Sequence, residues 1–235
     1  GGAADRGEIR PGHRLRVRIA DRALREINPV LDVAGRLLEL ADARLTASEV
    51  LDLLGTAPVR RRFHLGTAEL DRLRELTISA GVRWGVDAAH RRPYRLDSFG
   101  QNTWAAGLDR MLLGVAMDES SMHWLGTALP LDDVDSRDVE LVGTLAEFLD
   151  RLATAINTLS GEQPLTQWIT ALTDALDALT DTGPTESWQA TQARAELAGI
   201  VRTAGPYAAE VPLGLTDVRG LLGDRLQGRP TRADF

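Results

Sequence analysis

Residues 82–87 read VRWGVD and residues 103–117 read TWAAGLDRMLLGVAM, and these two segments decide the fold of the chain. In the second segment, the apolar residues at positions 104, 108, 111, 112 and 115 form one stripe at the 3.6-residue period of an α-helix. Thr103, or Asn102 before it, can cap this helix by accepting hydrogen bonds from the amides of its first turn. The pattern predicts an amphipathic core helix with Trp84 packed nearby.

Further amphipathic segments with clear helix starts lie on both sides of this stretch. Asn28 and Pro29 begin one helix, because proline at the first helical position loses no hydrogen bond. Thr46 and Glu49 form a capping box at the start of another. Other helices are expected to start near Thr67, Ser136, Pro164, Pro184 and Leu215. The helix from Thr67 should end at Gly81 in the left-handed conformation. A mainly α fold of about eight helices is therefore predicted.

Two N-terminal segments are expected to differ from the helical remainder. Residues 1–13 are polar and glycine-rich, which is typical of a flexible tail. Residues 15–19, LRVRI, alternate apolar and charged side chains, which predicts one short strand. An isolated strand is unstable in water, so this strand is expected to pair with a neighbouring domain. Residues 14–235 are predicted to form one irregular helical domain.

The composition excludes several classes of enzyme. The chain contains no cysteine, and all 27 of its lysine-or-arginine residues are arginine. Without lysine, this sequence can contain neither a Walker A phosphate loop nor a Schiff-base nucleophile. No apolar run approaches the roughly 18 residues of a membrane span, and residues 1–12 lack the apolar core of a signal peptide. We expect a cytoplasmic location, no contact with membranes and no cofactor bound to this fragment.

The net charge of −7 is unevenly distributed along the chain. Residues 1–100 carry 18 arginines against 14 acidic residues, whereas residues 101–235 carry 9 arginines against 20 acidic residues. An acidic surface repels nucleic acid, so any contact with phosphate is expected in the first half.

Two groups of arginines are the candidate DNA contacts, because the guanidinium fork suits phosphate. One group follows Pro58 on a short helical turn, and the other lies in the loop before the core helix. The alternative is that they are solvated or paired with the acidic half. Trp84 and Tyr94 could stack on bases, although Trp84 could equally be a core anchor. The six candidates are Arg60, Arg61, Arg62, Arg91, Arg92 and Arg95.

One acidic cluster, formed by Asp132, Asp133, Asp135 and Asp138, could in principle hold a metal ion. An EF-hand loop needs glycine at its sixth position and glutamate at its twelfth, and neither is present here. A solvated loop that places negative charge at the first turn of a helix explains these residues. No metal site and no catalytic residue are predicted.

Four segments resemble the RecC family, the gamma subunit of exodeoxyribonuclease V. They are IADRALREINPVL (19–31), LTASEVLDLL (45–54), RWGVDAA (83–89) and TWAAGLDRMLLGVAM (103–117), in the order found in the family. The half spanning residues 19–117 matches better than the acidic helical half, residues 118–235. Since the family's chains are several times longer, the resemblance implies an internal fragment.

The resemblance implies a non-catalytic role in an ATP-dependent helicase-nuclease that processes double-strand breaks for recombinational repair. It implies an accessory subdomain, called 2B, of a superfamily 1 helicase architecture, with the beta and alpha subunits as partners. DNA would be bound weakly, or only in the full complex. The alternatives are an unrelated helical protein-interaction domain, with an exposed apolar patch, and an enzyme with a carboxylate site.

Overall fold

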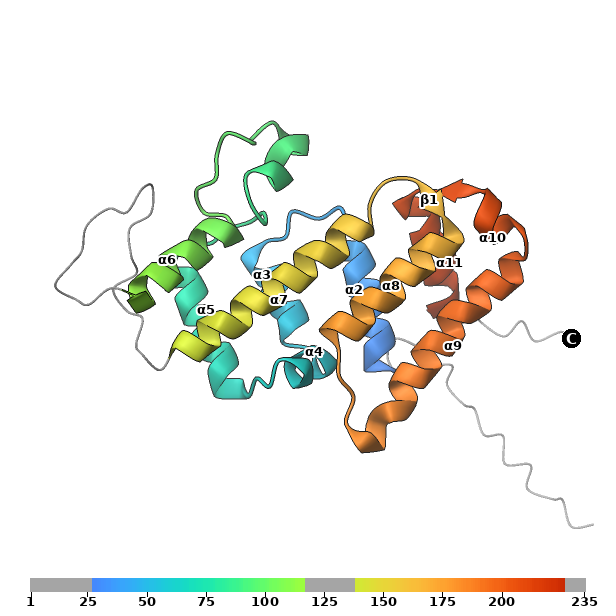
Figure 1. Ribbon diagram of the computed structural model, residues 1–235, viewed down its shortest axis with the longest axis horizontal. Helices are drawn as coiled ribbons and strands as arrows, with labels where there is room; N and C mark the ends of the chain where they lie inside the picture. The colour runs from blue at the N-terminus through green and yellow to red at the C-terminus, as the bar shows by residue number, and fades with distance from the viewer. Residues whose placement is uncertain (1–26, 117–137, 227–235) are drawn as a thin grey trace, which may run out of the picture.

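The computed structural model describes residues 27–116 and 138–226, and these residues form a mainly helical body (Figure 1). The predicted α fold is confirmed. In chain order the elements are α2 (Pro29–Leu40), α3 (Ala47–Leu54), α4 (Ala57–Arg62), α5 (Thr67–Ser79), η1 (Ala89–Tyr94), α6 (Trp104–Ala116), α7 (Val139–Thr158), β1 (Gln163–Pro164), α8 (Leu165–Leu179), η3 (Pro184–Glu186), α9 (Ser187–Ala204), α10 (Tyr207–Glu210), β2 (Pro212–Leu213) and α11 (Leu215–Leu226).

The helix starts follow the local signals in the sequence. The side chain of Asn28 accepts hydrogen bonds from the amides of Val30 and Leu31 at 3.0 and 3.3 Å. The capping box of Thr46 is present, and Gly81 has a φ of +74° as predicted. The predicted tail, the predicted strand at 15–19 and the predicted helix start at 136 lie outside the described residues.

The sequence did not predict the small sheet. β1 and β2 pair antiparallel, with Gln163 opposite Leu213, and the indole of Trp168 donates to the carbonyl of Leu213 at 2.9 Å. β1 and β2 are additional to the strand expected at residues 15–19, which lies outside the described residues. Strands of two residues are too short to show an alternating pattern, so only their tertiary pairing reveals them.

α2 is the central helix of the body, because it contacts α3, α4, α7, α8, α9 and α11. Its two ends are tied to elements from the distant half of the chain. At its N-terminus, the amide of Asn28 donates to the backbone carbonyl of Gln189 and the side chain of Gln192, both at 2.9 Å. At its C-terminus, the guanidinium of Arg219 donates to the carbonyl of Leu38 and pairs with Asp42.

These ties join both halves of the chain around one core. The described buried apolar side chains form a single cluster that includes residues of α2, α5, α7, α8 and α9. In Figure 1, α7 crosses the front of the body, with α6 towards one end and α8 towards the other. The hydrogen bonds from Arg219 also lower the pKa of Asp42, which favours the charged form that this contact needs. The predicted domain limits, 14–235, include undescribed residues and stay a prediction.

The segment before α6 packs against the start of this helix, as the sequence suggested. Trp104 is 2% exposed, and its indole nitrogen donates to the carbonyl of Leu45 at 3.1 Å. The Trp104 amide donates to the carbonyl of Gly85 at 2.9 Å, and a single β-bridge joins Thr46 to Trp84. The segments before α3, before η1 and at the start of α6 therefore meet at one point.

The predicted apolar stripe of α6 is wrong at one position. Met111 is fully buried, but Leu112 is 42% exposed. The side chains of consecutive helical residues point about 100° apart, so only one of these two side chains can point into a narrow interface between α6 and the body. The buried line runs instead through Trp104, Gly107 and Met111.

Gly107 permits the close approach of α6 to the preceding segment. A Cβ at this position would lie 2.2 Å from Cγ2 of Val82, whereas a Cβ at Gly143 in α7 would meet nothing within 4 Å. We expect Gly107→Ala to lower the free energy of unfolding by about 1–3 kcal/mol through overpacking, since Val82 is stiff at χ1.

Gly143→Ala is the matched control, because it makes the same change where there is room. It should raise the free energy of unfolding by about 0.5–1 kcal/mol through helix propensity alone. Urea denaturation of both variants measures the difference. Stabilisation by both substitutions would show that α6 and Val82 are not closely packed.

Candidate nucleic-acid interface

The three arginines of α4 lie in three different environments. Successive residues of a helix point about 100° apart, so they cannot share one face. Arg61 forms an ion pair with Glu186 of η3, and Nε of Arg62 donates to the carbonyl of Ala178 at 3.2 Å. Arg61 therefore ties α4 to η3, and Arg62 ties it to the C-terminal end of α8. Nε of Arg60 is enclosed by protein and has no acceptor among the described residues.

Arg60 lines a hollow of about 360 Å³ at the end of α4. The hollow also carries Arg61 and His64, and it ends at Gly66, the N-cap of the 13-residue helix α5. No side chain caps this helix by a hydrogen bond, and the first amides of an α-helix have no intrahelical acceptor. The hollow thus combines side-chain cations with a helix N-terminus. We call it the α4 hollow.

The second arginine group lies in residues 87–102, here called the arginine loop, and Arg91 is its internal brace. Arg91 is 5% exposed. One terminal nitrogen donates to the carbonyls of Phe99 and Gln101 and the other to that of Trp84, each at 2.8 Å. Burial lowers the pKa of Arg91 from its ordinary value. The sequence proposed Arg91 as a DNA contact, whereas the structure places its guanidinium inside the loop.

The other two arginines of this loop face outward. The side chain of Arg92 is 76% exposed, with Nε 4.0 Å from a carboxylate oxygen of Asp97. Arg95 is also exposed and has a φ of +57°. The loop presents apolar side chains as well, because Leu96 is 37% and Phe99 54% exposed. The loop can therefore offer both cations and apolar contacts to a partner.

Trp84 and Tyr94 are occupied by contacts within the protein. Their rings pack edge to face with centroids 5.2 Å apart. Arg91 lies over the ring of Trp84 at 4.4 Å, and Arg44 lies 5.7 Å from the same ring and 5.1 Å from that of Tyr94. These arrangements hold the base of the arginine loop together and leave Trp84 half-buried.

The structure does not bring the two arginine groups together. In Figure 1, α4 lies at the lower edge of the body, and the arginine loop with η1 projects from the upper edge. A single nucleic-acid strand would have to pass around the body to meet both groups. Sequence separation gave no indication of this arrangement.

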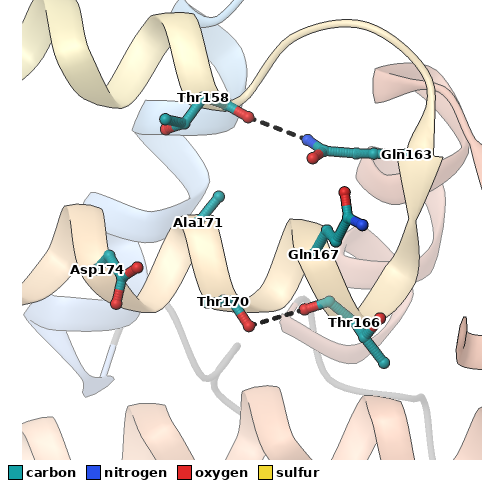
Figure 2. A pocket seen from close by; sticks show the side chains of 7 residues that line it. All are labelled: Thr158, Gln163, Thr166, Gln167, Thr170, Ala171 and Asp174. Atoms are coloured by element: carbon teal, nitrogen blue, oxygen red, sulfur yellow. Dashed lines mark hydrogen bonds between the residues drawn. The ribbon is translucent and has the colours of Figure 1, made fainter.

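A hollow of different character is a groove among the described elements (Figure 2). It has a volume of about 440 Å³ and lies along α8, beside the end of α7 and β1. Thr170 donates to the carbonyl of Thr166 at 2.9 Å and Gln163 to that of Thr158 at 3.0 Å. Its lining consists of Thr158, Gln163, Thr166, Gln167, Thr170, Ala171 and Asp174. With one carboxylate and no cation in that lining, the groove can offer hydrogen bonds but cannot neutralise a phosphate.

The acidic cluster is only partly described. Asp138 is 6% exposed, and Arg72 donates to both of its carboxylate oxygens, so Asp138 belongs to the packing of α5 against α7. Asp132, Asp133 and Asp135 lie outside the described residues. Within the ranges that are described, no three potential ligands from His, Asp or Glu lie close enough to hold a metal ion. None of the described helices has the length and apolar character needed to cross a bilayer.

His90 is a half-buried histidine of the arginine loop. Its Nδ1 is enclosed and has no hydrogen-bond partner. Burial lowers the pKa of His90, although the charge of Asp87 opposes the shift. A neutral imidazole of this kind packs in the arginine loop beside Arg91 and offers no positive charge to a ligand.

The described residues thus form a helical body with two separate basic features, the α4 hollow and the arginine loop. Comparison with known proteins identifies the family to which this helical domain belongs. The model of the fourth domain of the RecBCD enzyme subunit RecC matches residues 27–230, and the chain belongs to this family. The resemblance noted from the sequence is confirmed, and the family match extends well beyond residue 117.

The curated relatives agree with the family match. The chain is 50% identical over 229 residues to the RecBCD enzyme subunit RecC of Mycobacterium tuberculosis (strain ATCC 25618 / H37Rv), covering 97% of this chain and 21% of that protein. The corresponding protein of Mycolicibacterium smegmatis is 51% identical over 225 residues, covering 96% and 20%. That of Escherichia coli (strain K12) is 36% identical over 217 residues, covering 88% and 18%. The chain thus spans about a fifth of the length of these relatives.

Proposed function

We propose that this chain is a non-catalytic scaffold and DNA-handling module of the gamma subunit of exodeoxyribonuclease V. The complex would act in recombinational repair of double-strand breaks, in the cytoplasm. The observation that carries the proposal is the family match over residues 27–230. The relatives are named as subunits of an enzyme, so the beta and alpha subunits are the expected protein partners. The helical fold agrees with an accessory subdomain of the 2B type.

The packing of the body supports a scaffold role. α2 is tied at both ends to α9 and α11 by Asn28 and Arg219. The arginine loop is braced by three hydrogen bonds from Arg91 to backbone carbonyls. A surface that is held in this way loses little conformational freedom when a partner docks, which favours binding.

The exposed arginines support a role in DNA handling. Arg92 and Arg95 face outward from the arginine loop, and Arg60 lines the α4 hollow. Arg61 and Arg62 have partners inside the protein, so they should contribute less. Few phosphate contacts and an acidic second half together mean weak, sequence-independent binding by the isolated chain.

We expect the triple variant Arg60→Ala, Arg92→Ala, Arg95→Ala to lose binding of a fluorescent single-stranded oligonucleotide. Three contacts on a single strand give a slope of log affinity against log salt of roughly −2, since each contributes about 0.7. Fluorescence anisotropy across a salt series measures both quantities. Arg91 is left intact, because replacing it would disturb the loop itself.

The control is the double variant Arg194→Ala, Arg202→Ala, which removes exposed charge from α9 in the acidic half. It should bind the oligonucleotide nearly as tightly as the parent chain does. The only expected difference is the small effect of removing two positive charges elsewhere on the surface. If the triple variant binds as the parent does, or if the control loses binding equally, the DNA-handling half of the proposal is wrong.

A protein-docking role for the arginine loop is the second candidate. The family match overturns the hypothesis of an unrelated helical interaction domain. The exposed side chains of Leu96 and Phe99, 37% and 54% accessible, nevertheless favour contact with a protein surface. Phe99→Ala separates the candidates, because it should weaken a protein contact while leaving the salt-dependent binding of DNA unchanged.

A further inference from the structure

We infer that residues 92–99, the tip of the arginine loop, dock into an apolar pocket rimmed by carboxylates on another protein subunit, and that Arg44 beside the loop is a further anchor. This inference deepens the protein-docking candidate above, because it gives the chemistry of the partner and a contact residue that the sequence patterns did not indicate. That the partner is a subunit of the same complex rests on the proposed function.

The tip is exposed, yet hydrogen bonds hold it in one conformation. Every residue from 92 to 99 is exposed, whereas Arg91 is buried beneath and donates to three backbone carbonyls. The amide of Leu96 donates to the carbonyl of Arg91 at 3.2 Å, and that of Phe99 to the carbonyl of Leu96 at 3.1 Å. Arg95 has a φ of +57°, which a non-glycine residue keeps only where its surroundings impose it. Such a tip loses little conformational freedom on docking.

The apolar side chains of the tip favour a protein partner. Tyr94 and Leu96 are each 37% exposed and Phe99 is 54% exposed, so three apolar groups lie within six residues. Clustered exposed apolar groups mark interaction sites on soluble proteins. Aromatic residues and arginine are also the types enriched in protein interfaces and among their energetically dominant contacts.

Arg44 extends this surface from outside the loop. It is exposed, and its guanidinium lies 5.1 Å from the ring centroid of Tyr94 and 5.7 Å from that of Trp84. Packing against aromatic rings orients a guanidinium and leaves the donors at its edge available. Within residues 27–116 and 138–226, no acceptor takes these donors. Arg44 is therefore an oriented donor that fits a carboxylate.

Charge defines the rim of the partner's pocket. Arg44, Arg92 and Arg95 bring three positive charges against the one negative charge of Asp97. Carboxylates are the protein groups that pair with guanidinium, often through two hydrogen bonds. An apolar centre that receives Phe99, with Asp or Glu around it, therefore complements both features of the tip.

Nucleic acid complements this surface less well. Its phosphates would attract the same arginines, and its bases can stack on Phe99. Leu96, however, has no ring on which a base can stack, and Asp97 repels phosphate. A protein pocket satisfies the apolar and the charged groups together, whereas a nucleic-acid strand leaves part of the apolar surface in water.

The position of the loop favours contact with a separate chain. The first and last described helices, α2 and α11, pack against each other. Figure 1 shows the arginine loop projecting from the body well away from α11. The beta and alpha subunits of the proposed function supply such separate chains.

The first test is photo-cross-linking from the tip. Phe99→p-benzoylphenylalanine is introduced into the full-length gamma subunit, which is assembled with the beta and alpha subunits and illuminated. We expect one cross-link to another subunit, and mass spectrometry should place it among apolar residues with Asp or Glu nearby. A cross-link that stays within the gamma subunit, or no cross-link at all, overturns the inference.

The second test measures the association of the full-length gamma subunit with its partner subunits. Phe99→Ala and Arg44→Ala should each weaken association about tenfold or more, as expected for an anchoring contact. Ser98→Ala is the matched control for the first variant, since Ser98 is an exposed polar residue of the same tip, and Arg202→Ala on α9 is the control for the second. Both controls should leave association unchanged. Equal effects in variants and controls would overturn the inference.

Oligonucleotide binding by the same variants separates this inference from the proposed function. Weaker subunit association in Phe99→Ala with unchanged DNA binding supports the inference, whatever the Arg60, Arg92 and Arg95 triple variant shows. Weaker DNA binding in Phe99→Ala with unchanged association assigns the tip to nucleic acid and overturns the inference. That second result leaves the DNA-handling proposal standing.

Discussion

We expect Trp104→Ala to lower the free energy of unfolding by about 3–5 kcal/mol, the range typical of large aromatic truncations in a core. Trp104 is 2% exposed, and its indole nitrogen donates to the carbonyl of Leu45 at 3.1 Å. Truncation leaves a cavity at the first turn of α6 and an acceptor without its donor. Both losses fall where three segments of the chain meet.

Trp188→Ala is the matched control, because Trp188 is 47% exposed at the start of α9. An exposed truncation away from such contacts should change stability by only about 0.5 kcal/mol. Guanidinium denaturation followed by circular dichroism measures both variants without relying on tryptophan fluorescence. Similar losses in the two variants would mean that the contact between Trp104 and Leu45 does not organise the core.

The second large effect is expected at Arg91. Arg91→Ala removes the donors for the carbonyls of Trp84, Phe99 and Gln101, each 2.8 Å from the guanidinium. We expect a loss on the order of 3 kcal/mol, because charged donors are worth more than neutral ones and partly buried acceptors are left unpaired. Arg91→Lys should recover only part of the loss, since a point charge cannot replace the fork.

Arg92→Ala tests the adjacent residue, whose side chain is 76% exposed. Its effect on stability should stay within about 0.5 kcal/mol. Hydrogen exchange of the arginine loop adds a local readout, in which Arg91→Ala exposes backbone amides of the loop and Arg92→Ala does not. Equal exchange in both variants would argue against the brace. A confirmed brace would also explain why Arg91 must stay in place when DNA contacts are tested.

The arginines of this chain thus fall into two groups, one that stabilises the fold and one that is available for binding. Arg91 and Arg219 donate to backbone carbonyls and hold elements together. Arg92 and Arg95 are exposed, and Arg60 lines the α4 hollow. A variant that replaces all six sequence candidates would mix loss of structure with loss of binding. Only the separated variants can distinguish the two causes.

The sequence by itself determined the helices, because their signals are local. Asn28 with Pro29, the capping box of Thr46 and Glu49, and Gly81 all act within a few residues of the helix ends that they define. The four segments that resemble RecC also needed no knowledge of the fold, and the family match over residues 27–230 confirms them. Hydrogen bonding between residues near in sequence explains why such signals survive without tertiary information.

Tertiary structure alone decided which arginines face solvent. Arg91 and Arg92 are neighbours with the same chemistry, yet the first is buried against carbonyls from residues 84, 99 and 101 and the second is exposed. The pairing of β1 with β2, and the position of α4 at the opposite edge of the body from the arginine loop, likewise depend on distant partners. The free energy of a charged side chain is set by acceptors, burial and solvent around it, and these are supplied by segments that the local sequence does not contain.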